Sequence, residues 1–504
     1  MRWLWLLLLG GSVLAQRGPA QTDDPTPADS LQRGLTNLGN SVWLTGQNAA
    51  GLPNWQSFGY GITTLGATHN TGDFRRPQAP RQQTAYALSS EGLRSVGRWL
   101  VYGEFAYQKT RDQQISFSHG YDPFNGNPYL WADTLAGEPD AARWTRDHIR
   151  ARVALSSPRL GRWRLGLTVP YHVGQGSRLL DPKPFYRVRE LGVLPSVWYQ
   201  AGPRWGWGVV AGGQSTQEEN EVGYFATDYP LLYRLRGYGS FSRSPVVTAE
   251  RLVSGTVWQG RLQTLHHTNP SAGAQSPSWL GQVGGQFRRE TIREGVASPE
   301  AGGKFAETTL DGLVAYVRPV AAGGSRVALR TDVRNGIGTD PILRTTGATY
   351  LLATAAIDAT RWRQTAGVFR RDGVRLLAES LDYQDKITQT NWSAVRLTGH
   401  YDVLRRWERS DGGAWQVGAT AGVRWIPATQ FNALRPTRLT TILTRPDYQI
   451  QTTSAALLNG SVGRDFRIKR FGNLLHRVDF QFSGQFTDAG NRLTGSLNYH
   501  LLYL

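Results

Sequence analysis

The chain has 504 residues, enough for two or three soluble domains or for one large barrel. It contains no cysteine, which excludes a disulfide framework and a thiolate metal site. Its formal net charge of +18 at pH 7 predicts an anionic partner, such as nucleic acid, acidic lipid or an anionic solute.

The chain begins with a predicted signal peptide, residues 1–15. The stretch MRWLWLLLLGGSVLA has one basic residue, a short apolar run and a small-residue end, and cleavage is expected near Ala15. The apolar run is too short to span a bilayer as a helix. Because the chain is then exported, we expect no nucleic-acid partner.

A different composition follows in residues 16–34, which are polar and carry three prolines. Such a stretch is typical of an extended and poorly ordered tether. We therefore predict a flexible periplasmic N-terminal segment over residues 16–34 and an outer-membrane domain over residues 35–504.

Short runs with apolar side chains at every second place recur from residue 35 onward. In one of them, Trp163, Leu165 and Leu167 alternate with Arg164 and Thr168. Period two is the pattern of a β-strand, and helical spacing is rare in this chain. Several runs reach about nine to eleven residues, the length of a tilted transmembrane strand. The fold class is therefore predicted to be all-β.

The ends of these runs favour a membrane barrel over a soluble sandwich. Tryptophan and tyrosine lie at both ends of the apolar faces, as in Trp99 with Tyr107 and Trp415 with Trp425. Aromatic rings of this kind belong at the level of lipid headgroups. In a bilayer an open sheet edge is too costly, so the sheet must close. We predict a transmembrane antiparallel β-barrel of roughly 14 strands, within a range of about 12–18.

Connections of unequal length separate the predicted strands. We expect long loops over residues 108–147, 174–194, 214–246, 266–279 and 371–389. Short turns are expected at residues 158–161 and 411–413. Long outer loops and short periplasmic turns are usual in such barrels.

The final 27 residues, VDFQFSGQFTDAGNRLTGSLNYHLLYL, have the pattern of a hairpin. A strand that continues to the last residues is explained if it pairs with the first strand and closes the barrel. The tail NYHLLYL resembles the C-terminal signal of Gram-negative outer-membrane proteins. It differs from the usual form because Leu504, rather than phenylalanine, is last.

Three stretches carry a family resemblance: QNAAGLP, YDPFNGNPYLWADTLAGEP and GSRLLDPKPFYRVRELGVLPSVWY. They resemble an uncharacterised family of Gram-negative outer-membrane β-barrels encoded beside TonB-dependent receptors and partner lipoproteins. The resemblance implies a role in nutrient uptake and supplies no catalytic residue. It singles out a loop motif consisting of Asn127, Pro128, Asp133, Asp181 and Pro182. QNAAGLP is also similar to the N-terminal segment that plugs long-chain fatty-acid transporter barrels.

Basic and polar side chains on the lumen face are the main candidate site. The predicted lumen-facing residues are Arg150, Arg152, Arg162, Arg164, His172, Arg396 and His400. Guanidinium groups in a wet lumen would concentrate anions and bind carboxylate or phosphate. The alternative is that these arginines brace the barrel wall through acidic side chains and carbonyls.

No motif in the sequence indicates catalysis. A GxSxG elbow is absent, and the histidines are explained as structural polar residues. The spacing of Asp122, Asn125 and Asn127 lacks the glutamate of a calcium loop and favours turns stabilised by these side chains. We predict no enzyme activity, no cofactor and no metal.

Together these features predict an outer-membrane barrel that acts in uptake or permeation. It would be accessory to a TonB-dependent transport assembly, in contact with outer-membrane lipid and lipopolysaccharide and with a TonB-dependent receptor and surface lipoproteins as partners. One alternative is a non-conducting scaffold for lipoproteins or secretion machinery. The other is an outer-membrane hydrolase.

Overall fold

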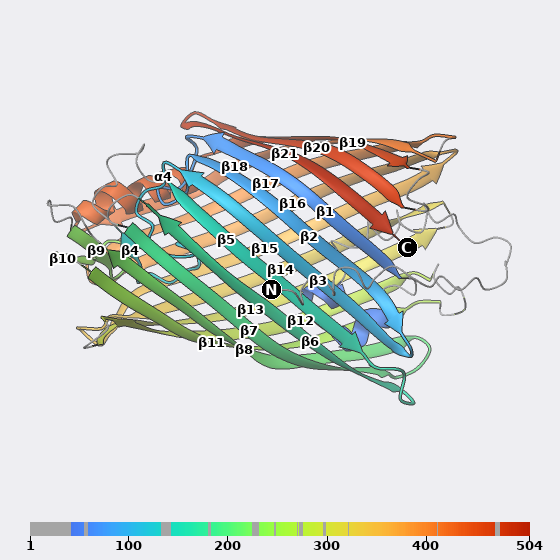
Figure 1. The fold of residues 1–504 in the computed structure, drawn as a ribbon, viewed down its shortest axis with the longest axis horizontal. Helices are drawn as coiled ribbons and strands as arrows, with labels where there is room; N and C mark the ends of the chain where they lie inside the picture. The colour runs from blue at the N-terminus through green and yellow to red at the C-terminus, as the bar shows by residue number, and fades with distance from the viewer. Residues whose placement is uncertain are drawn as a thin grey trace, which may run out of the picture. The chain divides into compact units, whose positions relative to one another are not determined.

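The computed structural model describes residues 42–54, 59–132, 143–179, 183–223, 231–245, 248–269, 271, 276–295, 299–320, 322–410, 412–468 and 474–503. These residues form an 18-stranded sheet, a three-stranded sheet and short helices (Figure 1). The predicted signal peptide and flexible segment, residues 1–34, lie outside the described residues. No described helix is both long and apolar enough to span a bilayer.

The wall strands are 13 to 21 residues long, and each is antiparallel to its neighbours. They are β1 (Tyr60–Gly72), β2 (Gln82–Val96), β3 (Trp99–Gln113), β5 (Trp144–Ser156), β6 (Trp163–Arg178), β7 (Lys183–Gln200), β8 (Trp205–Gly223), β11 (Thr248–His267), β12 (Ser278–Glu294), β13 (Glu300–Val320), β14 (Gly323–Thr339), β15 (Thr346–Thr365), β16 (Val368–Asp385), β17 (Thr390–Glu408), β18 (Ala414–Ala433), β19 (Ala455–Arg467), β20 (Leu475–Thr487) and β21 (Gly490–Tyr503).

The first and last wall strands pair with each other. Their register runs from Gly61 opposite Tyr503 to Gly72 opposite Arg492. This pairing closes the sheet and confirms the predicted all-β, closed antiparallel barrel. The wall has 18 strands rather than roughly 14, which is the upper limit of the predicted range.

The strand count was too low because many strands continue beyond their apolar part. The second half of β8, QSTQEENEVG, is polar on both faces and therefore shows no alternation. Most of residues 174–194 and 371–389, predicted as loops, also belong to strands, namely β6, β7 and β16. Only about nine to eleven residues of each strand are needed to cross a bilayer.

An apolar belt surrounds the outer face. On β6, Leu165 and Leu167 are exposed between Trp163 and Tyr171. We call the end where β1 begins and β21 ends the turn end, and the opposite end the loop end. Large aromatic residues collect on the outer face at the turn end: Trp99, Trp163, Tyr199, Trp205, Trp279, Trp407, Trp415 and Tyr503. Such a girdle is typical of a membrane interface.

Long connections at the loop end fold into a lid. Strands β4 (Trp131–Ala132), β9 (Leu231–Leu235) and β10 (Phe241–Pro245) form its sheet, and helices η4 (Thr440–Thr444) and α4 (Arg445–Gln451) complete it. Figure 1 shows the sheet and α4 at the end opposite the C-terminus. The lid has an apolar core of its own: Ala132, Tyr233, Leu235, Leu439 and Leu443.

Buried polar contacts fix the lid to the wall. The carboxylate of Asp385, at the end of β16, accepts hydrogen bonds from the backbone amides of Gly239 (2.8 Å), Ser240 (2.9 Å) and Thr388 (3.0 Å). Arg76 holds Asp447 of α4 through two bonds of 2.6 and 2.7 Å. The loop end therefore carries an ordered structure rather than independent loops.

The belt predicts losses of stability of different size for substitutions at two adjacent residues of β18. Ala421 faces outward between Trp415 and Trp425, whereas Thr420 faces the lumen. Ala421→Arg should lower the free energy of unfolding by about 2–4 kcal/mol, because the charge enters hydrocarbon. Thr420→Arg should lower it much less. Urea unfolding in lipid vesicles measures both, and equal losses would contradict the assignment of the two faces.

Candidate functional site in the barrel lumen

An N-terminal segment lies inside the barrel. We call residues 42–54 the inner segment; it contains helices α3 (Val42–Thr45) and η1 (Ala49–Asn54). Asn48, between them, is fully buried. Its side-chain amide donates to the side-chain carbonyl oxygen of Gln263 on β11 (2.8 Å). The Gln263 amide in turn donates to the Val42 carbonyl (2.8 Å). Asn48 and Gln263 thus join the inner segment to the wall.

Other wall residues satisfy the backbone of the inner segment. Thr168 donates to the Gln47 carbonyl (2.9 Å), and the Ala50 amide donates to the Ser196 hydroxyl (3.1 Å). A side chain at Gly166 would collide with the backbone at Ala50, so glycine permits this close approach. The wall of β6 and β7 is therefore complementary to the inner segment.

An aromatic contact completes this packing. Trp43 meets Trp198 of β7 edge to face, with ring centroids 5.0 Å apart. A Cβ at Gly51 would clash with the Trp43 ring, and a Cβ at Gly206 would clash with the Trp198 ring. The QNAAGLP stretch, which resembles a lumen plug, is thus placed within the barrel by buried polar and aromatic contacts.

Two histidines lie together on the wall between the inner segment and the lid. His148 Nδ1 lies 3.1 Å from His172 Nε2, and His148 Nε2 lies 3.0 Å from the Tyr186 hydroxyl. His172 Nδ1 lies 3.4 Å from the Glu190 carboxylate. Tyr121, from the loop after β3, covers the cluster, and burial raises the pKa of Tyr121 while the nearby Arg150 guanidinium opposes that rise.

This cluster does not have the form of a hydrolase centre. A serine–histidine mechanism needs a nucleophilic hydroxyl in contact with the imidazole. Within the described chain, His172 has His148 and Glu190 as its polar neighbours. The cluster provides hydrogen-bonding groups on the lumen wall.

The four arginines predicted to share one lumen wall have different surroundings. Arg152 pairs with Glu104 and donates to the Leu44 carbonyl (3.1 Å). Arg164 contacts Asn54 of the inner segment (3.4 Å). Arg150 donates to the Tyr121 hydroxyl (2.8 Å), and no described carboxylate lies within ion-pair distance of it.

The placement of Arg162 differs from the prediction. Strand β6 begins at Trp163, so Arg162 lies in the preceding turn and is exposed. The alternation of Arg162 with Trp163 suggested a strand position, but the chain turns before the alternation begins. Arg162 therefore does not join the row of inward arginines.

The remaining lumen candidates lie on β17. Arg396 pairs with Glu379 of β16 at 2.9 Å, a contact that braces two neighbouring strands. His400 lies opposite Gly422, whose missing side chain leaves room for the imidazole. Neither residue contacts the inner segment in the described structure.

The loop motif connects the lid to the wall. The Asn127 amide donates to Glu290 of β12 (2.8 Å), and its carbonyl oxygen accepts from the Tyr129 amide (2.9 Å). Arg251 of β11 donates to the Tyr129 carbonyl, and Trp131 donates to Glu294 (2.8 Å). Asp133, Asp181 and Pro182 lie outside the described residues, and Pro128 contributes packing against Gly338.

The turn chemistry expected for this loop is present. Asp122 accepts a hydrogen bond from the Phe124 amide (2.8 Å), and Asn125 accepts one from the Asn127 amide (2.9 Å). Both are side-chain turns of the kind that Asp and Asn favour. Burial raises the pKa of Tyr129 well above its ordinary value.

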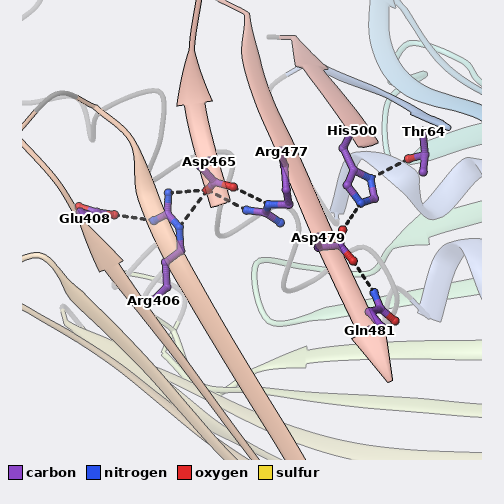
Figure 2. Close-up of polar contacts among 8 residues, drawn as sticks. All are labelled: Thr64, Arg406, Glu408, Asp465, Arg477, Asp479, Gln481 and His500. Carbon is purple, nitrogen blue, oxygen red and sulfur yellow. Dashed lines mark hydrogen bonds and ion pairs between the residues drawn. The ribbon is translucent and has the colours of Figure 1, made fainter. Parts of the chain in front are cut away.

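Sequence reasoning missed an ion-pair network at the turn end. Figure 2 shows Asp465 of β19 between Arg406 of β17 (3.2 Å) and Arg477 of β20 (2.6 Å). Glu408 pairs with Arg406 at 2.6 Å and balances the second positive charge. The alternation along each strand indicates that these charged side chains face the lumen. Which of them become neighbours depends on the register between strands, which the sequence does not show.

A second network lies across the barrel seam. Figure 2 shows His500 of β21 between Asp479 of β20 (2.5 Å) and Thr64 of β1 (2.8 Å). Asp479 also accepts from Gln481 (2.9 Å) and Asn498 (3.1 Å). Side chains therefore support the backbone pairing between the last and first strands.

A row of aromatic side chains at the loop end was also missed. Tyr350, Tyr383, Trp392 and Phe431 are directly opposite one another on strands β15 to β18. The rings of Tyr383 and Trp392 stack at 4.4 Å, and Tyr448 of α4 packs against Trp392. The lid covers this row, so the row supports the lid.

Comparison with known proteins identifies the family. A family model described as "Family of unknown function (DUF6850)" matches residues 49–503, and the chain belongs to this family. No functionally curated protein matches the sequence.

Several solved barrels are similar in form. BauA, the ferric preacinetobactin receptor from Acinetobacter baumannii, has 7% identity and a TM-score of 0.37, with 88% of this chain and 80% of that chain covered. The ferric citrate transporter FecA has 8% identity and a TM-score of 0.39, with 88% and 78% covered. OpdK from Pseudomonas aeruginosa, solved with vanillate, has 10% identity and a TM-score of 0.30, with 88% and 99% covered. No ligand is carried over from them to this chain.

The network around Asp465 predicts a large loss of stability when its central carboxylate is removed. Asp465→Asn leaves two buried guanidiniums without their shared partner and should cost about 3–5 kcal/mol. Asp73→Asn, at an exposed pair with Arg81 (2.7 Å), should cost about 0–1 kcal/mol. Urea unfolding in detergent compares the two variants. A similar cost for both would show that the Asp465 network does not support the wall.

Proposed function

We propose that this member of the DUF6850 family is an outer-membrane β-barrel that passes a solute through its lumen, with the inner segment as a gate. The observation that carries the proposal is the position of residues 42–54 within the barrel, hydrogen-bonded to β5, β6, β7 and β11. The apolar belt and the aromatic girdle support an outer-membrane location.

The contacts of the inner segment suit a gate better than a permanent core. The wall is held by strand-to-strand ladders that do not include residues 42–54. The segment is held by single hydrogen bonds, each worth about 0.5–1.5 kcal/mol net, and by the buried side chains of Trp43 and Leu52. A solute that binds better when the segment is displaced could therefore shift the equilibrium toward an open lumen.

The lumen supports a polar or anionic solute. Most inward arginines are neutralised, as Arg152 is by Glu104 and Arg396 is by Glu379. Arg150 is different because its described partner is a tyrosine hydroxyl. A cation of this kind in a wet lumen would raise the local concentration of anions.

The proposal includes an accessory role in TonB-dependent transport, with a TonB-dependent receptor and surface lipoproteins as partners. This part rests on the family resemblance of the sequence. A non-conducting scaffold is the competing function, and the buried inner segment also fits it. Conductance separates the two functions, because release of the inner segment should increase the conductance of a gated channel but not that of a non-conducting scaffold.

Release of the inner segment should increase conductance. Asn48→Ala together with Gln263→Ala removes the bond between them and the bond from Gln263 to the Val42 carbonyl. The variant should conduct more in planar bilayers than the wild type. Gln416→Ala, an inward glutamine of β18, serves as the control and should leave conductance unchanged.

A disulfide provides the reverse test. The chain has no cysteine, and the Ala50 amide lies 3.1 Å from the Ser196 hydroxyl. Ala50→Cys with Ser196→Cys should hold the segment closed when oxidised and allow opening when reduced. The gate would be contradicted if conductance changed neither in the Asn48→Ala/Gln263→Ala variant nor on oxidation of the Ala50→Cys/Ser196→Cys variant.

Charge selectivity should depend on Arg150. In the released background, Arg150→Gln should reduce the preference for anions, because an unneutralised lumen charge is lost. Arg94→Gln removes an equal charge from the outer face of β2 and should have no effect. The reversal potential across a salt gradient measures both variants, and the effect should shrink at 1 M salt, where the screening length is about 3 Å. An unchanged reversal potential for Arg150→Gln would exclude a role in selectivity.

A further inference from the structure

A basic hollow lies on the outer face at the loop end. It has a volume of about 670 Å³ and is bordered by β12, β13 and the loop between β14 and β15. Arg293, Lys304 and Arg344 line it, with Glu300 as its exposed carboxylate. This volume is within the range of about 300–1,000 Å³ that is usual for small-molecule sites.

The cations of this hollow have no ionic partners among the residues that the structure describes. Among the described residues, no carboxylate lies within ion-pair distance of Arg293, Lys304 or Arg344. Asp340, which also borders the hollow, accepts hydrogen bonds from the backbone amides of Ile342 and Leu343, both at 2.8 Å. Its carboxylate therefore serves the turn, and the hollow keeps an excess of positive charge.

Two outward cations elsewhere at the loop end have acidic neighbours. Arg187 lies 3.7 Å from Glu219 and 3.5 Å from Glu221. Lys109 lies 3.7 Å from Asp147. Those cations are paired within the wall, whereas three cations without a carboxylate partner among the described residues border the one hollow.

The apolar belt begins directly below the hollow. On β12, Arg289 and Phe287 face outward in succession toward the belt, and both are exposed. On β13, Leu310 lies on the same face as Lys304 and is 60% exposed. Ile342 and Leu343 are exposed beside Arg344. One face thus combines cations around the hollow with exposed apolar side chains beside it and toward the belt.

We infer that this hollow binds the phosphate groups of an anionic glycolipid in the surrounding leaflet, with its acyl chains against the belt below. Guanidinium groups bind phosphate through paired donors, and a lysine adds a compact charge. In the outer leaflet of an outer membrane, the lipid with this chemistry is the phosphorylated lipid A part of lipopolysaccharide. The inference rests on the outer-membrane location proposed above and is independent of the gate.

The test uses the purified full chain in detergent, with bis-phosphorylated lipid A and dephosphorylated lipid A in mixed micelles as probes. Native mass spectrometry or fluorescence titration gives the dissociation constants. The wild type should prefer the phosphorylated probe. The variant R293Q/K304Q/R344Q should lose affinity for it by roughly 100-fold, since each cation near an anionic lipid is worth about fivefold.

A control variant separates this site from net charge. R94Q/R98Q/R204Q removes three exposed arginines at the turn end and should bind within about twofold of the wild type. Heat-modifiable migration confirms that each variant folds. Equal binding by the two triple variants, or no preference of the wild type for phosphorylated lipid A, would overturn the inference.

Two further measurements distinguish the sources of failure. Inorganic phosphate alone, added as a competitor at millimolar concentration, should displace lipid A only weakly. Complete displacement would assign the hollow to a free phosphate and overturn the lipid. Membrane fractionation tests the outer-membrane location separately, so a protein absent from that membrane would contradict the proposed function even if lipid A binds in micelles.

Discussion

Backbone pairing between β1 and β21 is the constraint on which the rest of the structure depends. In hydrocarbon, every peptide N–H and C=O must be satisfied within the protein, so a spanning sheet cannot leave an edge open. The two strands pair along almost their full length, from Gly61 to Gly72. Because an up-and-down antiparallel sheet closes this way only with an even number of strands, the start of β1 and the end of β21 lie at the same end. The short turn between β2 and β3 lies at that end, and the lid lies at the other.

Closure also decides how the interior is built. An enclosed lumen must balance its own charges, and the Arg406–Asp465–Arg477 network does so across β17 to β20. The lid and the inner segment occupy a space lined by polar side chains and, at the loop end, by an aromatic row that includes Tyr383 and Trp392. Asn127 fixes the lid through Glu290, and Asn48 fixes the inner segment through Gln263. Apolar packing adds to these hydrogen bonds, as Tyr129 packs on Val253 and Trp43 packs on Trp198. Neither part belongs to the strand ladders of the wall, so the wall does not depend on them for its backbone pairing.

The sequence predicted the parts of the fold that leave a local pattern. Alternation on β6 and the aromatic ends of β18 indicated a barrel, and the last residues indicated closure. The loop-end half of β8 gave the pattern of a loop because both faces of the strand are hydrophilic there. Contacts over long sequence distances could not be predicted, such as Asn127 with Glu290, 163 residues apart. Arg162 was predicted on a strand, but the turn before β6 extends one residue further than expected and includes Arg162.

Cross-linking of the closing strands tests the central claim most directly. Ala67 and Leu497 are opposite each other in the β1–β21 register, at the spacing that a disulfide can span. In the native outer-membrane fraction, Ala67→Cys with Leu497→Cys should form an intramolecular disulfide in a chain that otherwise has no cysteine. Ala67→Cys with Leu493→Cys, four residues out of register and about 13 Å further along, should not. The same cross-linking in both variants, or none in the first, would contradict a barrel closed by β1 and β21.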